Sequence, residues 1–564
     1  MKTIILILRK IRREVGLNLF YVIWCAVKVI FYSMKPAPRA IRAALKQDEQ
    51  TLLGKRADAE TLLEQAKFYR ARASDKTEGL FEELKKIQVH LDQNRDVKKY
   101  PDPIRRPWQT TVNVLAELAS MTWPGNPRSD EEALDEFVTF LDQFETERQE
   151  QGRSLFRYYP LNKGKNDYWE WYLVPWHRTY GALTVALLDE RMRPRLMPIW
   201  NHYDRWFRNE RPWMTRLLVG SNVAAVNSGY ALHALMGYLI DDDAEEKKKY
   251  LSRYLRHTRG LHKALTASFD TGGRVSIPFE GITYSGFWFR TILILGLIQR
   301  ALGLEHSLLD QPALSGLSEY VWKSRTPDGD FQTSGDSHPT VDKGAIDRGT
   351  FGLLAELEDP YARQLASLFS EPHFLAGHLK EEIKGELQSV KMATPDLIVS
   401  RRKGEVLLNF QNETFESIMV VFHANALNPL VNTLHFGLKP GHLFVYCKRR
   451  EENKGRWVLT DPGYVNYFRG DQTDIERPDY NTLDKQKLLT PGWVRVRERD
   501  QAVELTSFTL LPLHRRTVTF SYDDTSASLV VKDFYLGNRR VHWNFETHLE
   551  QTRAFFRQER RIDL

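Results

Sequence analysis

Two asparagines stand where an apolar helical pattern begins, and their side-chain amides are candidates for contacting a ligand. Asn222 and Asn227 lie in the stretch SNVAAVNSG (221–229), and the apolar pattern ALHALMGYL follows it. One interpretation is that these polar side chains cap the helix, because asparagine and serine are favoured at helix N-termini. The other is that an amide hydrogen-bonds a substrate carboxylate. The residues alone leave both interpretations open.

A glutamate and a tyrosine four residues apart form a second candidate site. Glu280 and Tyr284 lie in FEGITYSGFW (279–288), which leads into an apolar helical pattern containing Trp288 and Arg290. A tyrosine phenol acts as a general acid or base when its pKa is lowered. The aromatic side chains of this stretch can equally be core packing.

A polar loop follows at 328–339 and reads DGDFQTSGDSHP. It contains Asp336 and His338, and His338 is a candidate general base. The alternative is an ordinary turn, because aspartate, serine, glycine and proline are the usual turn residues.

The periodicity around these stretches predicts a multidomain α+β chain. Apolar residues recur at helical spacing through the first two thirds, and short alternating runs rich in valine, threonine and phenylalanine follow. The expected helices include 130–144, 180–192, 227–240, 286–302 and 348–358. The expected strands are 397–402, 405–410, 417–424, 434–439, 442–450, 456–461, 493–499, 502–511, 516–522, 528–536 and 540–549.

Periodicity therefore predicts an N-terminal helical segment, a solenoid or toroid of helices and then a large antiparallel sheet or sandwich. The predicted domains are a basic and apolar membrane-anchor segment at 1–38, a helical spacer at 39–98, an all-α domain at 99–375 and an all-β domain at 376–564.

The N-terminal segment suggests a membrane anchor. Residues 17–34 read LNLFYVIWCAVKVIFYSM, which is at the short edge of what spans a bilayer, and basic residues flank both sides. The expectation is a single-pass or interfacial anchor, with the main domains periplasmic or otherwise extracytoplasmic. The alternative is an apolar helix packed on the body of the protein.

Composition narrows the classes of function. The 564 residues carry a formal net charge of +7, which suits an anionic ligand or surface but does not point to nucleic acid. The two cysteines, Cys25 and Cys447, exclude a disulfide framework or a zinc site built from cysteines. The oligomeric state is open.

In their order and spacing these stretches resemble the heparinase II/III-like polysaccharide lyases. The resemblance covers roughly residues 170–550 and rests on SNxxxVNxG, EGxTYxG and the GDS loop. In the C-terminal part it rests on LHFGL (434–438), DPG (461–463), NTL (481–483), RTVTF (516–520) and SLVVKDFYLG (528–537). Members of this family have an (α/α) toroid followed by an antiparallel β-sandwich, with the active cleft between them. The resemblance therefore implies an (α/α) incomplete toroid at 99–375 and an antiparallel β-sandwich at 376–564.

The resemblance implies β-elimination at a uronate of an anionic polysaccharide. Such a reaction needs a group that neutralises the C5 carboxylate, a base for the adjacent proton and an acid for the departing O4. By resemblance, Asn222 takes the first role and Tyr284 acts as acid and base, with His338 assisting. Asn227 and Glu280 would contact the substrate. Arg290, Trp288 and Asp336 are the further substrate-binding candidates, since arginine pairs with uronates and tryptophan stacks on sugar rings.

The sequence also departs from the family pattern. Where members usually carry His-x-His-x-Asp, this chain reads NPLVN from Asn428 to Asn432, and Tyr480 stands where a histidine usually precedes the Asn-Thr-Leu motif. Of the family's zinc ligands only Asp461 is present, and zinc takes about four ligands, so we expect no metal and no other cofactor. Two further readings therefore stand beside the lyase: a uronyl C5-epimerase, and a catalytically inactive protein that binds polysaccharide or acts as a scaffold in an envelope polysaccharide pathway.

Overall fold

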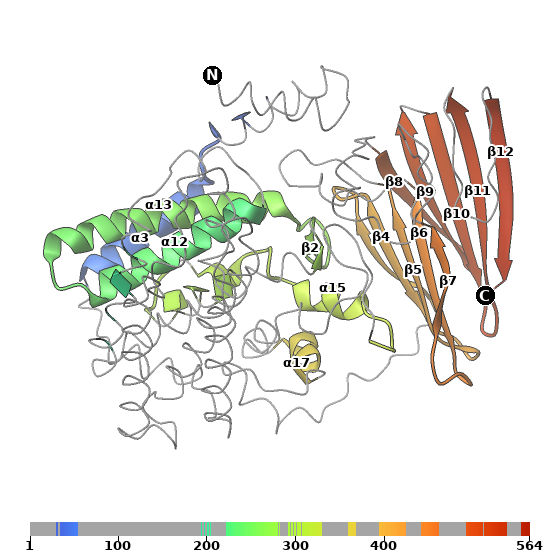
Figure 1. The fold of residues 1–564 in the computed structure, drawn as a ribbon, viewed down its shortest axis with the longest axis horizontal. Helices are drawn as coiled ribbons and strands as arrows, with labels where there is room; N and C mark the ends of the chain where they lie inside the picture. Colours follow the sequence, from blue (N-terminus) through green and yellow to red (C-terminus); the bar gives the residue numbers. More distant parts are fainter. Residues whose placement is uncertain are drawn as a thin grey trace, which may run out of the picture.

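The computed structural model describes helical and sheet regions in separate stretches of the chain (Figure 1). Single helical positions are also described within 27–31 and 193–204. The continuous stretches are residues 34–54, 221–279, 281–282, 359–367, 394–424, 441–461, 492–510, 513–537 and 554–563, with most of 292–329.

Two long helices, α12 (Ser221–Ile240) and α13 (Ala244–Ser268), lie side by side (Figure 1). The Asp243 side chain starts α13, because its Oδ1 accepts hydrogen bonds from the backbone N–H groups of Glu245 and Glu246 at 2.8 and 3.0 Å. These N–H groups hold the pKa of Asp243 below its ordinary value. The predicted helix at 227–240 is confirmed.

Close packing of the helix pair depends on a small residue. Gly237 of α12 faces the Tyr250 ring of α13, and a side chain at Gly237 would collide with that ring. Every residue from Asn227 to Ile240 is buried. A helix that is apolar around most of its circumference needs partners on several sides. One of them is α3 (Arg39–Gly54), where the carbonyl of Leu52 accepts a 2.5 Å hydrogen bond from the Tyr238 hydroxyl.

Short elements connect the helices to the sheets. After α13 come the hairpin strands β1 (Phe269–Asp270) and β2 (Ile277–Pro278), which pair antiparallel. They are followed by a 3-10 helix, η2 (Leu308–Asp310), and by helices α15 (Leu317–Lys323) and α17 (Pro360–Ser367).

Two five-stranded antiparallel sheets follow, each with its strands in sequence order. The first sheet contains β3 (Asp396–Ser400), β4 (Glu405–Phe410), β5 (Phe415–His423), β6 (His442–Arg449) and β7 (Arg456–Asp461). The second sheet contains β8 (Gly492–Arg499), β9 (Ala502–Leu510), β10 (Leu513–Tyr522), β11 (Ala527–Gly537) and β12 (Ala554–Asp563).

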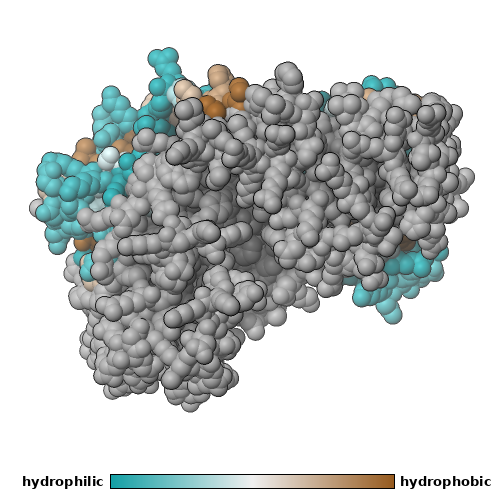
Figure 2. Space-filling view, turned by 45° about the horizontal axis from the view of Figure 1, so that its top comes forward, coloured by the Kyte–Doolittle hydropathy of each residue, from teal (hydrophilic) through white to brown (hydrophobic). Residues whose placement is uncertain are grey.

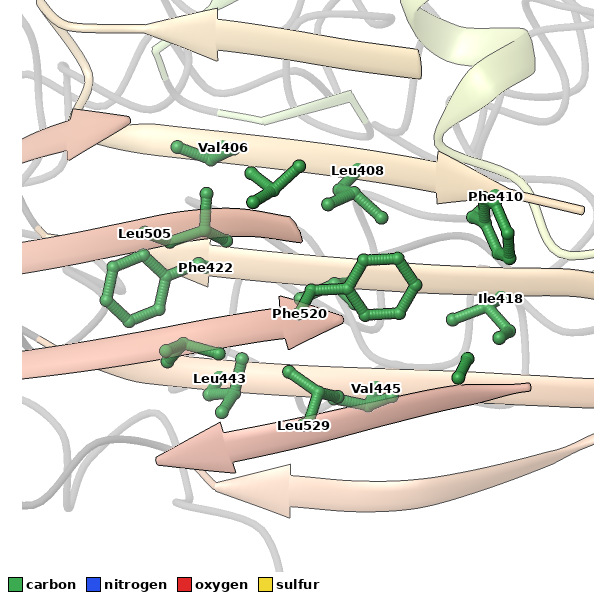
Figure 3. Packing of buried hydrophobic residues seen from close by; sticks show 14 of the residues in the cluster. Val406, Leu408, Phe410, Ile418, Phe422, Leu443, Val445, Leu505, Phe520 and Leu529 are labelled. Carbon is green, nitrogen blue, oxygen red and sulfur yellow. The ribbon is translucent and has the colours of Figure 1, made fainter. Parts of the chain in front are cut away.

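One hydrophobic core joins the two sheets (Figure 3). Alternate residues of β4, such as Val406, Leu408 and Phe410, meet side chains of the second sheet, such as Leu505 and Phe520. Successive residues of a strand point to opposite faces, so one face of each sheet supplies this core.

The first sheet is buried on its other face as well. Leu407, Met419 and Val421 alternate with the core residues and are at most 1% exposed. The second sheet differs, because β8 alternates between buried and exposed positions at its start. The first sheet therefore has partners on both faces, and on the outer face these include the segment from α13 to α15, as the contacts below establish.

The expected combination of helices with antiparallel sheets is confirmed, and β4 and β7 have the bounds predicted for 405–410 and 456–461. Strand β12 was not predicted. The expected helices at 130–144, 180–192 and 348–358 and the strands at 434–439 and 540–549 lie wholly or mostly outside the described residues, so the toroid and the domain boundaries stay predictions. Among the described stretches, no helix is both long and apolar enough to cross a membrane.

Candidate functional site

Only part of the predicted site lies in the described structure. Asn222 is in the first turn of α12, and Asn227 is one and a half turns further along. The remaining predicted site residues lie outside the described residues: Glu280, Tyr284, Trp288, Arg290, Asp336 and His338.

Asn227 lies in the contact between α12 and α13. Its Oδ1 is 3.0 Å from Nδ1 of His257, whose ring stacks on Tyr230 with centroids 4.7 Å apart. Gly260 allows this approach, because a Cβ there would lie 2.7 Å from Asn227 Oδ1. Asn227 is 1% exposed. It thus helps to fix α12 on α13, and its predicted contact with substrate stays a prediction.

The stretch FEGITYSGFW starts where the helical region meets the first sheet. Its first residue, Phe279, lies beneath the guanidinium of Arg402, with Cζ 5.2 Å from the ring centroid. Gly281 follows with φ of 89°, a conformation that side chains disfavour, and Ile282 is helical. The motif therefore leaves the β1–β2 hairpin by a tight glycine turn.

Polar contacts fix that hairpin to the first sheet. The Asp270 carboxylate accepts a 2.6 Å hydrogen bond from the Ser400 hydroxyl and a 3.3 Å bond from the backbone N–H of Arg402. The Arg402 guanidinium also donates to the carbonyl of Phe269 at 3.1 Å. We call the contacts between residues 269–328 and the first sheet the junction.

A buried ionic cluster lies in the junction. The Glu405 carboxylate accepts a 2.6 Å hydrogen bond from the Tyr320 hydroxyl of α15 and lies 2.8 Å from Lys403 Nζ. Nε2 of His423 is 3.8 Å from the same carboxylate. Lys403, Glu405 and His423 are each at most 4% exposed.

This environment sets the charge of the cluster. Burial raises the pKa of Glu405, but the Lys403 charge, His423 and the hydrogen bonds outweigh it and lower that pKa to about 2. Burial lowers the pKa of His423 to about 3, although Glu405 opposes the shift. At neutral pH the glutamate is therefore ionised and the histidine neutral.

A second ionic group extends the junction. Asp396 at the start of β3 is 3.0 Å from Arg274 Nη2 and 2.5 Å from Lys323 Nζ. Glu319 of α15 is within 3.0 Å of both cations. Burial raises the pKa of Asp396, but hydrogen bonds and charge from Lys323 and Arg274 lower it on balance. The four side chains tie α15 and the loop after β1 to the sheet.

The polar loop also starts on the first sheet, but at the opposite end. Asp328 Oδ2 accepts hydrogen bonds from the Tyr446 hydroxyl at 2.7 Å and from the backbone N–H of Gly455 at 2.8 Å. Strand register pairs Glu405 with His423 at one end of the sheet and places the turn after β6 at the other. The residue patterns therefore indicated two stretches that begin on the first sheet. They did not predict the ionic cluster of Lys403, Glu405 and His423, which lies at one end of that sheet.

Lys403 and Glu405 were missed because they flank Gly404 in what reads as an ordinary polar turn. The weak sequence signal for this ion pair was a lysine and a glutamate two residues apart at the start of a strand that is otherwise apolar. Among the described residues, no three histidine, cysteine, aspartate or glutamate side chains form a group that could hold a metal.

Comparison with known proteins gives similarity of structure without a match in sequence. No family model and no curated protein matches the chain. Among solved structures, the chain is similar to a chondroitin AC lyase of Streptomyces coelicolor in complex with chondroitin sulphate, with a TM-score of 0.48 and 10% identity. That match covers 86% of this chain and 70% of the other.

Two further structures are similar at lower TM-scores. A heparinase III with methylated lysines gives a TM-score of 0.37 and 12% identity over 79% of this chain and 66% of that one. A xanthan lyase of Paenibacillus gives a TM-score of 0.41 and 10% identity, and the match covers 86% of this chain and 49% of that one. All three are polysaccharide lyases. At TM-scores below 0.5, the similarity assigns neither a substrate nor a reaction to this chain, and both must be argued from its own residues.

Proposed function

We propose that this protein is a polysaccharide lyase that cleaves a uronate-containing anionic polysaccharide by β-elimination. The observation that carries the proposal is the start of the stretch FEGITYSGFW at the junction, with Phe279 beneath Arg402. The chain turns at Gly281 directly after this point, so the stretch begins at the boundary between the helices and the first sheet. The family that the sequence resembles has its cleft at the corresponding boundary.

The position of Asn222 supports the same reaction. It lies in the first turn of a 20-residue helix. The first N–H groups of a helix have no partner within the helix, and the helix dipole is positive at that end. Both effects favour an anion there, as the carboxylate of a uronate would be.

In the proposed reaction, Asn222 hydrogen-bonds the C5 carboxylate and stabilises the charge that develops when the C5 proton leaves. Tyr284, as phenolate, takes that proton. The carbanion electrons form a double bond between C4 and C5, the bond from C4 to O4 breaks, and the Tyr284 phenol returns the proton to O4. The return of the proton to O4 regenerates the Tyr284 phenolate, so the cycle needs no further base. His338 would assist by holding Tyr284 ionised, with its imidazole accepting the phenol proton once, before the first turnover.

The other predicted residues would bind the polymer. Arg290 and Trp288 suit a uronate and a sugar ring, respectively. Glu280 and Asp336 would accept hydrogen bonds from sugar hydroxyls. Asn227 would share the carboxylate contact, or act through α12 by way of its contact with His257.

The buried histidine of the first sheet does not supply the base. His423 is 4% exposed and its pKa is lowered to about 3, and a group with so low a pKa is a poor proton acceptor at neutral pH. The proposed proton transfer therefore does not use His423, and Tyr284 with His338 remain its proposed acid and base.

The test is ultraviolet absorbance of the unsaturated uronate on a panel of uronate polymers, with the full chain. The variants are Tyr284→Phe and Asn222→Ala, and Tyr522→Phe on the second sheet is the matched control. We expect absorbance to rise with the wild type and the control and to stay flat with the other two. A rise kept by Tyr284→Phe would refute its acid–base role.

One observation favours a second candidate, a catalytically inactive polysaccharide-binding or scaffold protein. The stretch from Asn428 to Asn432 and the residue Tyr480 lack the histidines that the family usually carries. Such a protein would bind a polymer in a gel-shift or calorimetric experiment and produce no absorbance and no shortening. A uronyl C5-epimerase would exchange the C5 proton with solvent deuterium and leave chain length unchanged.

A further inference from the structure

An exposed apolar stripe lies near the N-terminus. Val27, Ile30, Phe31 and Met34 are helical, and their exposures are 58%, 39%, 74% and 77%. Spacings of three, four and seven residues place side chains on one face of a helix. Among the described residues, these four account for most of the exposed large hydrophobic side chains, the others being Leu53 and Trp493.

An exposed stripe of this kind is typical of a surface that meets another molecule. Isolated exposed hydrophobic residues are common, but adjacent ones on a single face mark interaction sites. The space-filling view shows hydrophobic surface beside hydrophilic surface along the upper edge of the molecule (Figure 2).

Basic residues follow the stripe directly. Lys35 is exposed, and Arg39, Arg42 and Lys46 are exposed on α3 at spacings that share a helix face. The buried face of α3 is a different one, with Leu45, Asp48 and Leu52. The cations are therefore directed to solvent, next in the chain to the apolar stripe.

A partner that contacts both surfaces is apolar where it meets the stripe and anionic where it meets α3. An anionic lipid surface meets both needs, because acyl chains accept the hydrophobic face while headgroup phosphates attract lysine and arginine.

We propose that the stripe of Val27, Ile30, Phe31 and Met34, together with the exposed basic face of α3, binds in the plane of an anionic lipid surface. The face of Val27, Ile30, Phe31 and Met34 enters the boundary between headgroups and acyl chains, and the basic face of α3 contacts the lipid phosphates. The inference does not depend on the lyase reaction.

The experiment is flotation of the full chain with vesicles of phosphatidylcholine alone or mixed with phosphatidylglycerol. The wild type should float with the mixed vesicles and much less with phosphatidylcholine alone. Arg39→Glu with Arg42→Glu should weaken binding by about 30-fold or more, since each basic residue near the surface contributes about a factor of five. Phe31→Asp with Met34→Asp should weaken it by about 100-fold, because the buried apolar area is lost.

Two controls match these changes elsewhere in the chain. Lys248→Glu with Lys249→Glu makes the same charge change on exposed positions of α13, and Trp493→Asp removes an exposed apolar side chain of β8. Both should bind as the wild type does. Circular dichroism should be the same for all variants, since every changed position is exposed.

Several results would overturn the proposal. Equal binding to both kinds of vesicle would exclude the assigned surface, and so would binding that is kept both by the Arg39 and Arg42 variant and by the Phe31 and Met34 variant. Resistance to extraction at alkaline pH would indicate a helix that crosses the bilayer. The proposal would also be overturned if the wild type does not bind vesicles and sedimentation shows an oligomer that the Phe31 and Met34 variant does not form. In that case the stripe binds a second copy of the chain.

Discussion

Replacing Glu405 by glutamine is expected to loosen the junction, because it leaves the Lys403 ammonium buried beside a neutral amide. Nζ of Lys403 is 2.8 Å from the carboxylate, and the two side chains are 3% and 1% exposed, so solvent does not screen them. Removing one partner of a buried ion pair costs about 3–5 kcal/mol. Glutamine keeps an oxygen for the Tyr320 hydroxyl, so the change isolates the charge.

The assay is hydrogen exchange of the full chain, followed by mass spectrometry in α15, β4 and β5. A global unfolding curve is less suitable, because two-state unfolding is usual only for single domains below about 150 residues and this chain has 564. Local opening reports the junction alone. The expected energy corresponds to a loss of protection of about 10²- to 10⁴-fold in these elements.

The double variant Lys403→Met with Glu405→Gln is the matched control. It removes the isolated ammonium and keeps the acceptor for Tyr320, so protection should return to within about tenfold of the wild type. Unchanged protection in the single variant, or a double variant no better protected than the single one, would refute the charge-isolation argument.

The same pair predicts a pH dependence. The folded pKa of Glu405 is about 2, below its ordinary value of 4.5. A lowered carboxyl pKa stabilises the folded state above the unfolded pKa, and that stabilisation disappears as the pH falls through the folded pKa. Protection of α15 should therefore decline between pH 4.5 and about 2 in the wild type, and this decline should be smaller in Glu405→Gln.

Three further predictions concern other buried groups. In the wild type, the Arg516 guanidinium donates to the Asp533 carboxylate at 2.8 and 3.1 Å. Arg516→Met leaves that carboxylate buried without its cation, so the free energy of local opening of β10 and β11, measured by hydrogen exchange, should fall by about 3–5 kcal/mol. A fall of less than about 1 kcal/mol would contradict the role of the pair. The ring of His423, with a pKa of about 3, should show no titration between about pH 5 and 8 in a histidine-labelled NMR spectrum, and a midpoint near the ordinary value would show that the cluster is open to water. Gly260→Ala places a Cβ 2.7 Å from Asn227 Oδ1 and should destabilise the packing of α12 on α13 by about 1–3 kcal/mol. An unchanged hydrogen-exchange rate in α13 would show that the two helices accommodate the added methyl group without loss of stability.

The sequence by itself determined the elements whose periodicity is strong. The runs EVLLNF and RWVLTD became β4 and β7 with the predicted bounds, and the apolar pattern at 227–240 became the C-terminal part of α12. Side-chain period and turn residues are local properties, so a reading of neighbouring residues recovers them. The same rule explains the omission of β12, whose RQERR run resembles a solvated segment and forms a strand by pairing with β11 at the sheet edge.

Only the tertiary structure decided which face of the first sheet meets the helices, and with which residues. Tyr320 and Glu405 are 85 residues apart in the chain, and Ser400 and Asp270 are 130 apart. Side chains alternate between the two faces of β4, but both faces are largely apolar. The sequence therefore does not show which face meets the helices. Which partner covers each face depends on packing between distant segments, and so do the burial of Lys403 and Glu405 and the pKa of His423. The chemistry proposed for FEGITYSGFW rests on residue types and stays a prediction, whereas the place where the stretch starts, at the junction, came from the fold.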